Sequence, residues 1–157
     1  MPITHSSDSS VQRLQALSSH IATPLSGIHP FTAMASRDPI TCHVLDTTAG
    51  RPAADISVTL SCRASGAIFT AVTNSDGRIA TWQSSDVQIS VESIINENSK
   101  DQHGPSIWAI KFDTGAYFGT DKTFFPEVEV TFFVRPGQHY HVPLLLSPYS
   151  YSTYRGS

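Results

Sequence analysis

Apolar and polar residues alternate along most of the chain after residue 38. From Ile56 to Cys62 the alternation has a period of two, which is typical of a strand with one buried face. The same pattern, rich in β-branched and aromatic residues, predicts further strands at 40–46, 67–73, 107–112, 127–134, 139–146 and 149–154. Strands this short, separated by turns that contain Gly and Pro, indicate an antiparallel β-sandwich.

Helical periodicity is weak in the same part of the chain. Only 113–121 has the composition of a short helical turn. The segment 83–106 is long, polar and weakly patterned, and we expect it to be a loop inserted between two strands. The sequence therefore predicts an all-β domain with one short helix.

Residues 1–37 are rich in serine and lack the alternation, so we expect an N-terminal extension outside a domain of residues 38–157. Within the extension, apolar residues recur with helical spacing beside two basic residues. The apolar positions are Val11, Leu14, Leu17 and Ile21, and the basic positions are Arg13 and His20. An address read by a receptor, a mitochondrial transit peptide and a plain tail all fit this pattern.

Composition bounds the class of protein. The 157 residues suffice for one ordinary domain, and a content of 39% hydrophobic and 15% charged residues supports a packed core. A formal net charge of -3 lacks the basic footprint of a nucleic-acid-binding protein. No apolar run approaches the roughly 20 residues that cross a bilayer, so we expect a soluble protein with no membrane partner. Cys42 and Cys62 fit two buried thiols better than one disulfide, and both alternatives stay open.

Histidine is the residue type that stands out for chemistry. His139 and His141 lie two apart on a predicted strand, so their side chains point to the same face. Alternation along 40–46 also leaves His43 on the face away from the core, and Arg78 follows a turn ending in Gly77. The residues that alternation directs into the core are Ile40, Cys42 and Val44. Three histidines fit a zinc site, metal-free acid–base catalysis, or plain surface polarity.

Several motifs together resemble the 5-hydroxyisourate hydrolase family, the transthyretin-related enzymes of urate breakdown. The matching segments are 42–46, 73–78, 112–118, 124–128, 139–148 and 151–157. The final four residues, Tyr154, Arg155, Gly156 and Ser157, are the most specific part of the match. They distinguish the hydrolases from the hormone-carrying transthyretins, which have the sandwich but not this ending. The apolar and aromatic character of 143–157 also leads us to expect that this segment packs against the fold or another subunit.

The resemblance implies a fold, an assembly and a reaction. The fold is a prealbumin/transthyretin-like antiparallel β-sandwich of two four-stranded sheets with one short helix. The assembly is a homotetramer, a dimer of dimers whose central channel holds the active sites. The reaction is the hydrolysis of 5-hydroxyisourate, a small-molecule substrate, to 2-oxo-4-hydroxy-4-carboxy-5-ureidoimidazoline in purine catabolism. No metal and no organic cofactor is implied. The alternatives are a non-enzymatic transthyretin-like carrier of small aromatic ligands and a zinc-dependent amidohydrolase.

The resemblance also assigns residues. The catalytic set is His43, Arg78, His141 and Ser157, and the substrate-binding set is His43, Arg78 and Tyr154. His139 matches a recurrent neighbour of the site. We expect the two catalytic histidines to activate water and shuttle protons, without deciding which is the base, and Arg78 to stabilise charge on oxygen. Tyr154 positions the ring, and Ser157 fixes water or substrate.

The N-terminal pattern resembles a second signal. Arg13 and Leu14, five further residues, then His20 and Ile21 are similar to the type-2 peroxisomal targeting signal, with Ile21 a slight departure. This similarity implies a peroxisomal import receptor as a partner and a peroxisomal location, with the cytoplasm as the alternative.

Overall fold

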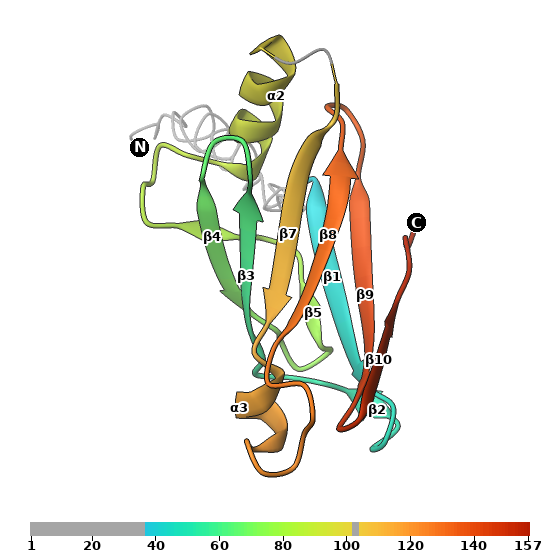
Figure 1. Ribbon diagram of the computed structural model, residues 1–157. Coiled ribbons are helices and arrows are strands. Elements are labelled where there is room, and N and C mark those ends of the chain that lie inside the picture. The colour runs from blue at the N-terminus through green and yellow to red at the C-terminus, as the bar shows by residue number, and fades with distance from the viewer. Residues whose placement is uncertain (1–36, 102–103) are drawn as a thin grey trace, which may run out of the picture. The chain divides into compact units, whose positions relative to one another are not determined.

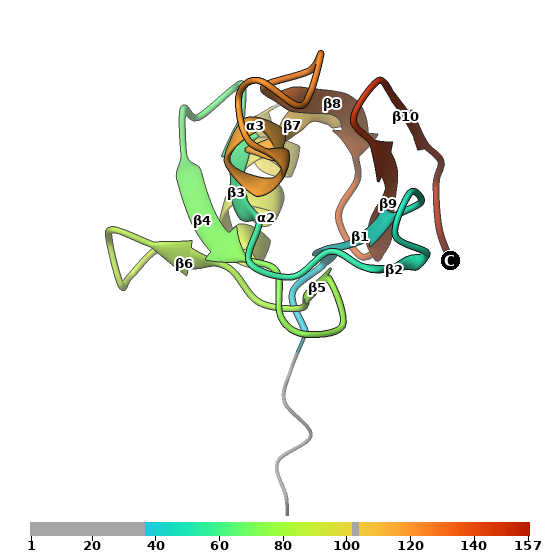
Figure 2. The ribbon, with the colours of Figure 1, turned by 90° about the horizontal axis from the view of Figure 1, so that it is seen from below.

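A computed structural model describes residues 37–101 and 104–157 (Figure 1). Of the extension predicted at 1–37, only Arg37 belongs to this part, so its targeting signal (Arg13, Leu14, His20 and Ile21) lies outside the described residues. From Arg37 onward two β-sheets pack face to face, which confirms the predicted sandwich. Figure 2 shows the layer with β9 and β10 and the layer with β3 and β4 on opposite sides of the domain.

The first sheet is built around β1 (Ile40–Asp46), which pairs in parallel with β9 (Tyr140–Ser147). Beyond β9 lies β10 (Ser150–Thr153), and two short strands, β2 (Arg51–Pro52) and β5 (Arg78–Ile79), pair with the other edge of β1. The parallel pair departs from the expected antiparallel arrangement. Alternation gives a strand's faces but not its direction relative to a partner 100 residues away, as Thr41 and His141 are.

The second sheet is antiparallel throughout. Its order is β6 (Gln83–Ser84), β4 (Ile68–Val72), β3 (Ser57–Cys62), β7 (Ser106–Phe112) and β8 (Val128–Val134). All seven predicted strands are therefore present. Three of the long strands lie in the first sheet and four in the second, and the two-residue strands β2, β5 and β6 bring each sheet to five instead of the expected four. Two residues are too few to leave a periodic pattern in the sequence.

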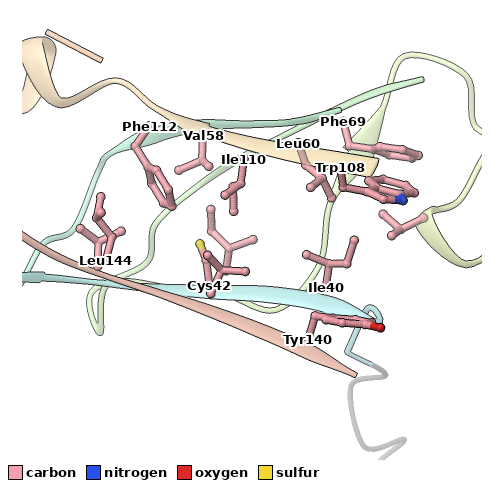
Figure 3. Packing of buried hydrophobic residues seen from close by; sticks show 14 of the residues in the cluster. Ile40, Cys42, Val58, Leu60, Phe69, Trp108, Ile110, Phe112, Tyr140 and Leu144 are labelled. Atoms are coloured by element: carbon pink, nitrogen blue, oxygen red, sulfur yellow. The ribbon is translucent and has the colours of Figure 1, made fainter. Parts of the chain in front are cut away.

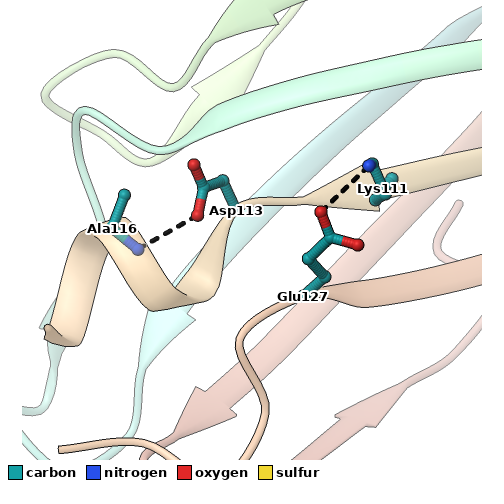
Figure 4. Close-up of polar contacts among 4 residues, drawn as sticks. All are labelled: Lys111, Asp113, Ala116 and Glu127. Carbon is teal, nitrogen blue, oxygen red and sulfur yellow. Dashed lines mark hydrogen bonds and ion pairs between the residues drawn. The ribbon is translucent and has the colours of Figure 1, made fainter. Parts of the chain in front are cut away.

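The short helix predicted within 113–121 is α3 (Thr114–Phe118). The side chain of Asp113 caps it, because the backbone N–H of Ala116 donates to Asp113 Oδ1 over 3.0 Å (Figure 4).

The prediction of a loop across 83–106 is wrong, since this segment contains α2 (Val91–Asp101). One face of the helix is buried and consists of Val91, Ile94 and Ile95. Because polar residues stand between them, this narrow apolar face does not give a clear helical periodicity in the sequence. Ser90 and Ser93 cap it reciprocally, each hydroxyl accepting from the other's backbone N–H over 3.1 and 3.0 Å. The usual sequence signature of this capping box has Glu or Gln in the second position, which Ser93 replaces here.

The core lies between the sheets, where the inward residues of β1, β3, β7 and β9 interdigitate (Figure 3). Ile40, Cys42 and Val44 are at most 1% exposed, which confirms the predicted inward face of β1. Cys42 and Cys62 are both buried free thiols, as favoured from the sequence, and burial raises the pKa of Cys42 to about 12. None of the helices in the described residues is long and apolar enough to cross a membrane.

Candidate active site

The outward face of β1 brings the predicted polar residues together. In the parallel pairing Thr41 lies opposite His141, and in the antiparallel pairing His43 lies opposite Arg78. Paired residues in a sheet point to the same face, and so do residues two apart on one strand. The central position of β1 therefore places all four side chains on the sheet face away from the core.

A tight turn delivers Arg78 to this face. Asn74 organises it, because the backbone N–H groups of Asp76 and Arg78 donate to Asn74 Oδ1 over 3.0 and 2.9 Å. Gly77 has a φ of 70°, and a Cβ there would run into the carbonyl oxygen of Val44. Glycine thus allows the close approach in which the N–H of Val44 donates to the Gly77 carbonyl over 2.8 Å.

A pocket of about 230 Å³ opens on the same face. The residues that line it include Thr41, Arg78, His139, His141 and Ser157. His43 stands beside the pocket, with its ring centroid 6.5 Å from that of His141. The fold thus gathers the predicted residues His43, Arg78, His141, Ser157 and His139 around one small space.

Tyr154 lies elsewhere in this chain. It lines a neighbouring, largely apolar pocket of about 220 Å³ between β8, β9 and the C-terminal segment, and it is 60% exposed. His141 lines both pockets, whereas Arg78 lines only the first and Tyr154 only the second. The catalytic and substrate-binding roles assigned to these residues stay predictions.

His141 is held at two edges of its ring. The hydroxyl of Thr41 lies 2.9 Å from Nδ1. On another edge, a Cβ at Gly156 would lie only 2.6 Å from Cδ2, and the N–H of Gly156 donates to the backbone carbonyl of His141 over 2.9 Å. Sequence reasoning missed both contacts, although the spacing of Thr41 and His43 by two residues already placed the threonine on the outward face.

The environment favours neutral imidazoles. Burial, followed by the positive charge of Arg78, lowers the pKa of His43 and of His141 from the ordinary value of 6.5. Burial, followed by the charge of Arg37, lowers the pKa of His139. A neutral imidazole that faces a wet pocket is able to accept a proton from water at neutral pH. In residues 37–101 and 104–157, no three His, Cys, Asp or Glu side chains are grouped so as to hold a metal ion.

A family model supports the resemblance read from the motifs. Residues 40–156 match the model described as HIUase/Transthyretin family. A protein of Schizosaccharomyces pombe named probable 5-hydroxyisourate hydrolase is 39% identical over 127 residues, which cover 75% of this chain and 90% of that protein.

Solved structures show the same fold with two kinds of title. The 5-hydroxyisourate hydrolase of Klebsiella pneumoniae superposes with a TM-score of 0.56 at 29% identity, over 75% of this chain and 98% of that one. Sea bream transthyretin in complex with thyroxine gives a TM-score of 0.57 at 28% identity, over 75% of this chain and 94% of that one. The backbone alone therefore does not distinguish a hydrolase from a carrier, and the side chains on the outward face of β1 have to.

Proposed function

The chain belongs to the HIUase/transthyretin family, and on that premise we propose where and how it hydrolyses 5-hydroxyisourate. The reaction opens the six-membered ring at a cyclic amide bond and yields 2-oxo-4-hydroxy-4-carboxy-5-ureidoimidazoline. The site is the pocket on the outward face of β1. One observation carries this proposal: two imidazoles with lowered pKa values and a guanidinium, on three different strands, converge beside one small pocket.

The hydrolysis requires three catalytic roles from the side chains of the protein. A water must lose a proton, the attacked carbonyl oxygen must be stabilised as it gains negative charge, and the leaving ring nitrogen must be protonated. His43 and His141, neutral at rest, take and return the proton. Arg78 offers its planar fork of N–H donors to the developing oxyanion. Ser157, at the rim of the pocket, holds water or substrate by its hydroxyl.

Tyr154 reaches the substrate in this proposal from the neighbouring pocket, across His141. Its ring supplies a flat apolar surface against which a planar heterocycle packs. A carrier has no use for a base and an oxyanion donor in one pocket, so the site chemistry and the hydrolase relatives together favour catalysis over ligand transport.

A homotetramer, a dimer of dimers, is the assembly that we propose for the chain. The support is that β8 and β10 are edge strands of the two sheets and carry exposed aromatic residues, among them Phe133 and Tyr151. Unpaired edges with apolar side chains favour pairing with another copy.

A peroxisomal location, with the cytoplasm as the alternative, follows from the resemblance of Arg13, Leu14, His20 and Ile21 to an import signal. The partner would be the peroxisomal import receptor. A fluorescent reporter carrying residues 1–37 gathers in peroxisomes if this is correct and stays diffuse if it is not.

The function is tested with 5-hydroxyisourate generated freshly by urate oxidation and followed by absorbance. Changing His141 to Ala should lower kcat about 10²- to 10⁴-fold, the range for loss of a general acid or base. Thr70→Ala, on an exposed position of β4, is the control and should keep the wild-type rate. Wild-type turnover by His141→Ala would show that this face is not the site.

A further inference from the structure

Thr41 joins His139, which precedes β9, to His141, the second residue of that strand. Its hydroxyl oxygen lies 2.9 Å from Nδ1 of His141 and 3.2 Å from Nε2 of His139, and the residue is only 6% exposed. A third contact, to the backbone carbonyl of Tyr140, is longer at 3.4 Å. The proposed reaction uses His141 but gives no task to Thr41 or His139.

Counting hydrogens shows what this bridge is able to do. A threonine hydroxyl has one hydrogen to donate and accepts with its lone pairs. It therefore donates to one neighbour at a time, either one of the two rings or the backbone carbonyl of Tyr140, and when both ring contacts are hydrogen bonds at least one imidazole donates to the threonine. If Thr41 donates to His139, Nδ1 of His141 carries a hydrogen and Nε2 of His141 is free to act as a base. If Thr41 donates to His141, the hydrogen of His141 lies on Nε2 and His139 donates to the threonine.

Going from the first arrangement toward the second moves two hydrogens along the bridge, from Nδ1 of His141 to Thr41 and from Thr41 to Nε2 of His139. At the same time Nε2 of His141 takes up a hydrogen from outside the bridge, and His139 becomes doubly protonated. We propose that His141, Thr41 and His139 form a proton relay in which His139 stores the proton taken from the attacking water. The relay deepens the proposed function and rests on it. Thr41 is a positioning residue in this scheme, because it acts through His141.

The step balances in both directions. As water attacks, its proton forms a bond to Nε2 of His141, the hydrogen on Nδ1 passes to Oγ1 of Thr41, and the threonine's own hydrogen passes to Nε2 of His139. The hydroxide adds to the carbonyl, and the positive charge rests on His139. When the C–N bond breaks, Nε2 of His141 gives its hydrogen to the ring nitrogen. The chain of transfers then reverses and restores all three groups.

Burial and Arg37 also lower the pKa of His139, so a proton held there is short-lived and returns readily along the bridge. The groups that influence His141 are His43 on β1, Arg78 on β5, His139 and Arg37. Arg78 disfavours a lasting positive charge on His141, whereas the cation that acts on His139 is Arg37. Moving the positive charge from His141 to His139 takes it away from the ring beside Arg78. The guanidinium of Arg78 then stabilises the oxyanion without a second positive charge next to it.

Kinetics in mixtures of H₂O and D₂O test the relay. Several protons move in one step, so kcat of the wild type should fall along a curve as the deuterium fraction rises. Thr41→Val removes the hydroxyl at nearly constant volume, and should lower kcat about 10- to 100-fold, as when orienting partners of metal-bound histidines are lost, with little change in KM. Its remaining dependence on deuterium should be linear. Thr41→Ser keeps the hydroxyl and should recover most of the lost rate and the curvature.

Two further comparisons complete the test. His139→Gln keeps a hydrogen-bonding group near Thr41 but cannot hold the proton, and should also give a linear dependence, which makes the result independent of how well Thr41→Val folds. Thr70→Val on β4 is the matched control for the threonine change. A linear dependence in the wild type, or slowing by Thr41→Val with the curvature intact, would overturn the relay while leaving the hydrolase function standing. Absence of wild-type turnover would refute the function itself.

Discussion

The outward faces of the two sheets carry different chemistry, although both sheets have the same alternation of apolar and polar residues. Both sheets send alternate apolar residues into a shared core, and on both the positions between them point away from it. On β1 these positions carry Thr41 and His43, which stand beside a pocket. On β7 the outward Lys111 donates to Glu127, the residue before β8, over 3.0 Å (Figure 4). Alternation alone therefore specifies the core, while the outward residues and their solvation specify the chemistry.

The two outward faces differ more in how far water reaches their titratable side chains than in the types of residue that they carry. The side chains of Lys111 and Glu127 are 43% and 59% exposed, so water screens their attraction. His43 and His141 are partly withdrawn from water beside Arg78, and their pKa values are lowered for that reason. Among the residues that the structure describes, the ion pair lies on the β7 face, whereas burial and Arg78 disfavour a positive charge on the histidines of the β1 face. Shifted pKa values of this kind are typical of active sites.

The difference between the two outward faces is tested most strongly by a substitution at Arg78. Changing it to Lys keeps the positive charge but removes the planar fork, and should lower kcat about 10²- to 10³-fold, the range for loss of one oxyanion donor. Arg63→Lys, at an exposed arginine that follows β3, is the matched control and should leave kcat unchanged. Steady-state kinetics measure both variants. Equal kcat for Arg78→Lys and the wild type would mean that the face around β1 is no more specialised than that around β7.

The acid limb of the pH–rate profile gives a second, smaller effect. Because burial and Arg78 lower the pKa of His43 and His141, both are mainly neutral at pH 7 and reach half protonation only below pH 6.5. The acid limb of kcat/KM should therefore have its midpoint below pH 6.5, and the rate should fall by at least about tenfold per pH unit well beneath the lowered pKa. A midpoint at or above pH 6.5 would contradict the withdrawal of these rings from water.

The same shifts predict the direction of the stability change. The unfolded chain, with histidine pKa values near 6.5, binds more protons than the folded chain between that value and the lowered one. The free energy of unfolding should therefore decrease as the pH falls from about 6.5 through the lowered pKa values. Urea unfolding at a series of pH values measures this, and a rise in stability on acidification would show that the histidines gain partners for their charge instead.

Much of the fold could be predicted from the sequence because the longer strands show a clear alternation of apolar and polar residues. Seven strands and the inward face of β1 were predicted correctly. The two-residue strands were not, since their pairing is set by neighbours and not by their own residues. Helix α2 was missed because Ser93 stands where a capping box usually has Glu or Gln, and its buried stripe is short.

The site was predictable in part. The spacing of His139 and His141 placed both on one face, and the alternation of β1 put His43 outward. Convergence of these groups depends on the parallel register of β1 with β9 and on the close approach of Gly77, and both are tertiary facts. Thr41 escaped notice because a threonine on a strand is ordinary until its two imidazole partners, 98 and 100 residues away, are known.

The smallest effect is expected on the opposite face, at Lys111. Changing it to Ala breaks the ion pair with Glu127 and should reduce the free energy of unfolding by about 0–1 kcal/mol, because both groups are already solvated. A double-mutant cycle with Glu127→Ala isolates the pair from the loss of the lysine stem, and urea unfolding measures each variant. The value of kcat should not change, since the core separates this pair from the pocket beside β1. A measurable drop in kcat, with stability unaltered, would show that the two faces are coupled through the sandwich. The view that only the face around β1 serves catalysis would then be wrong.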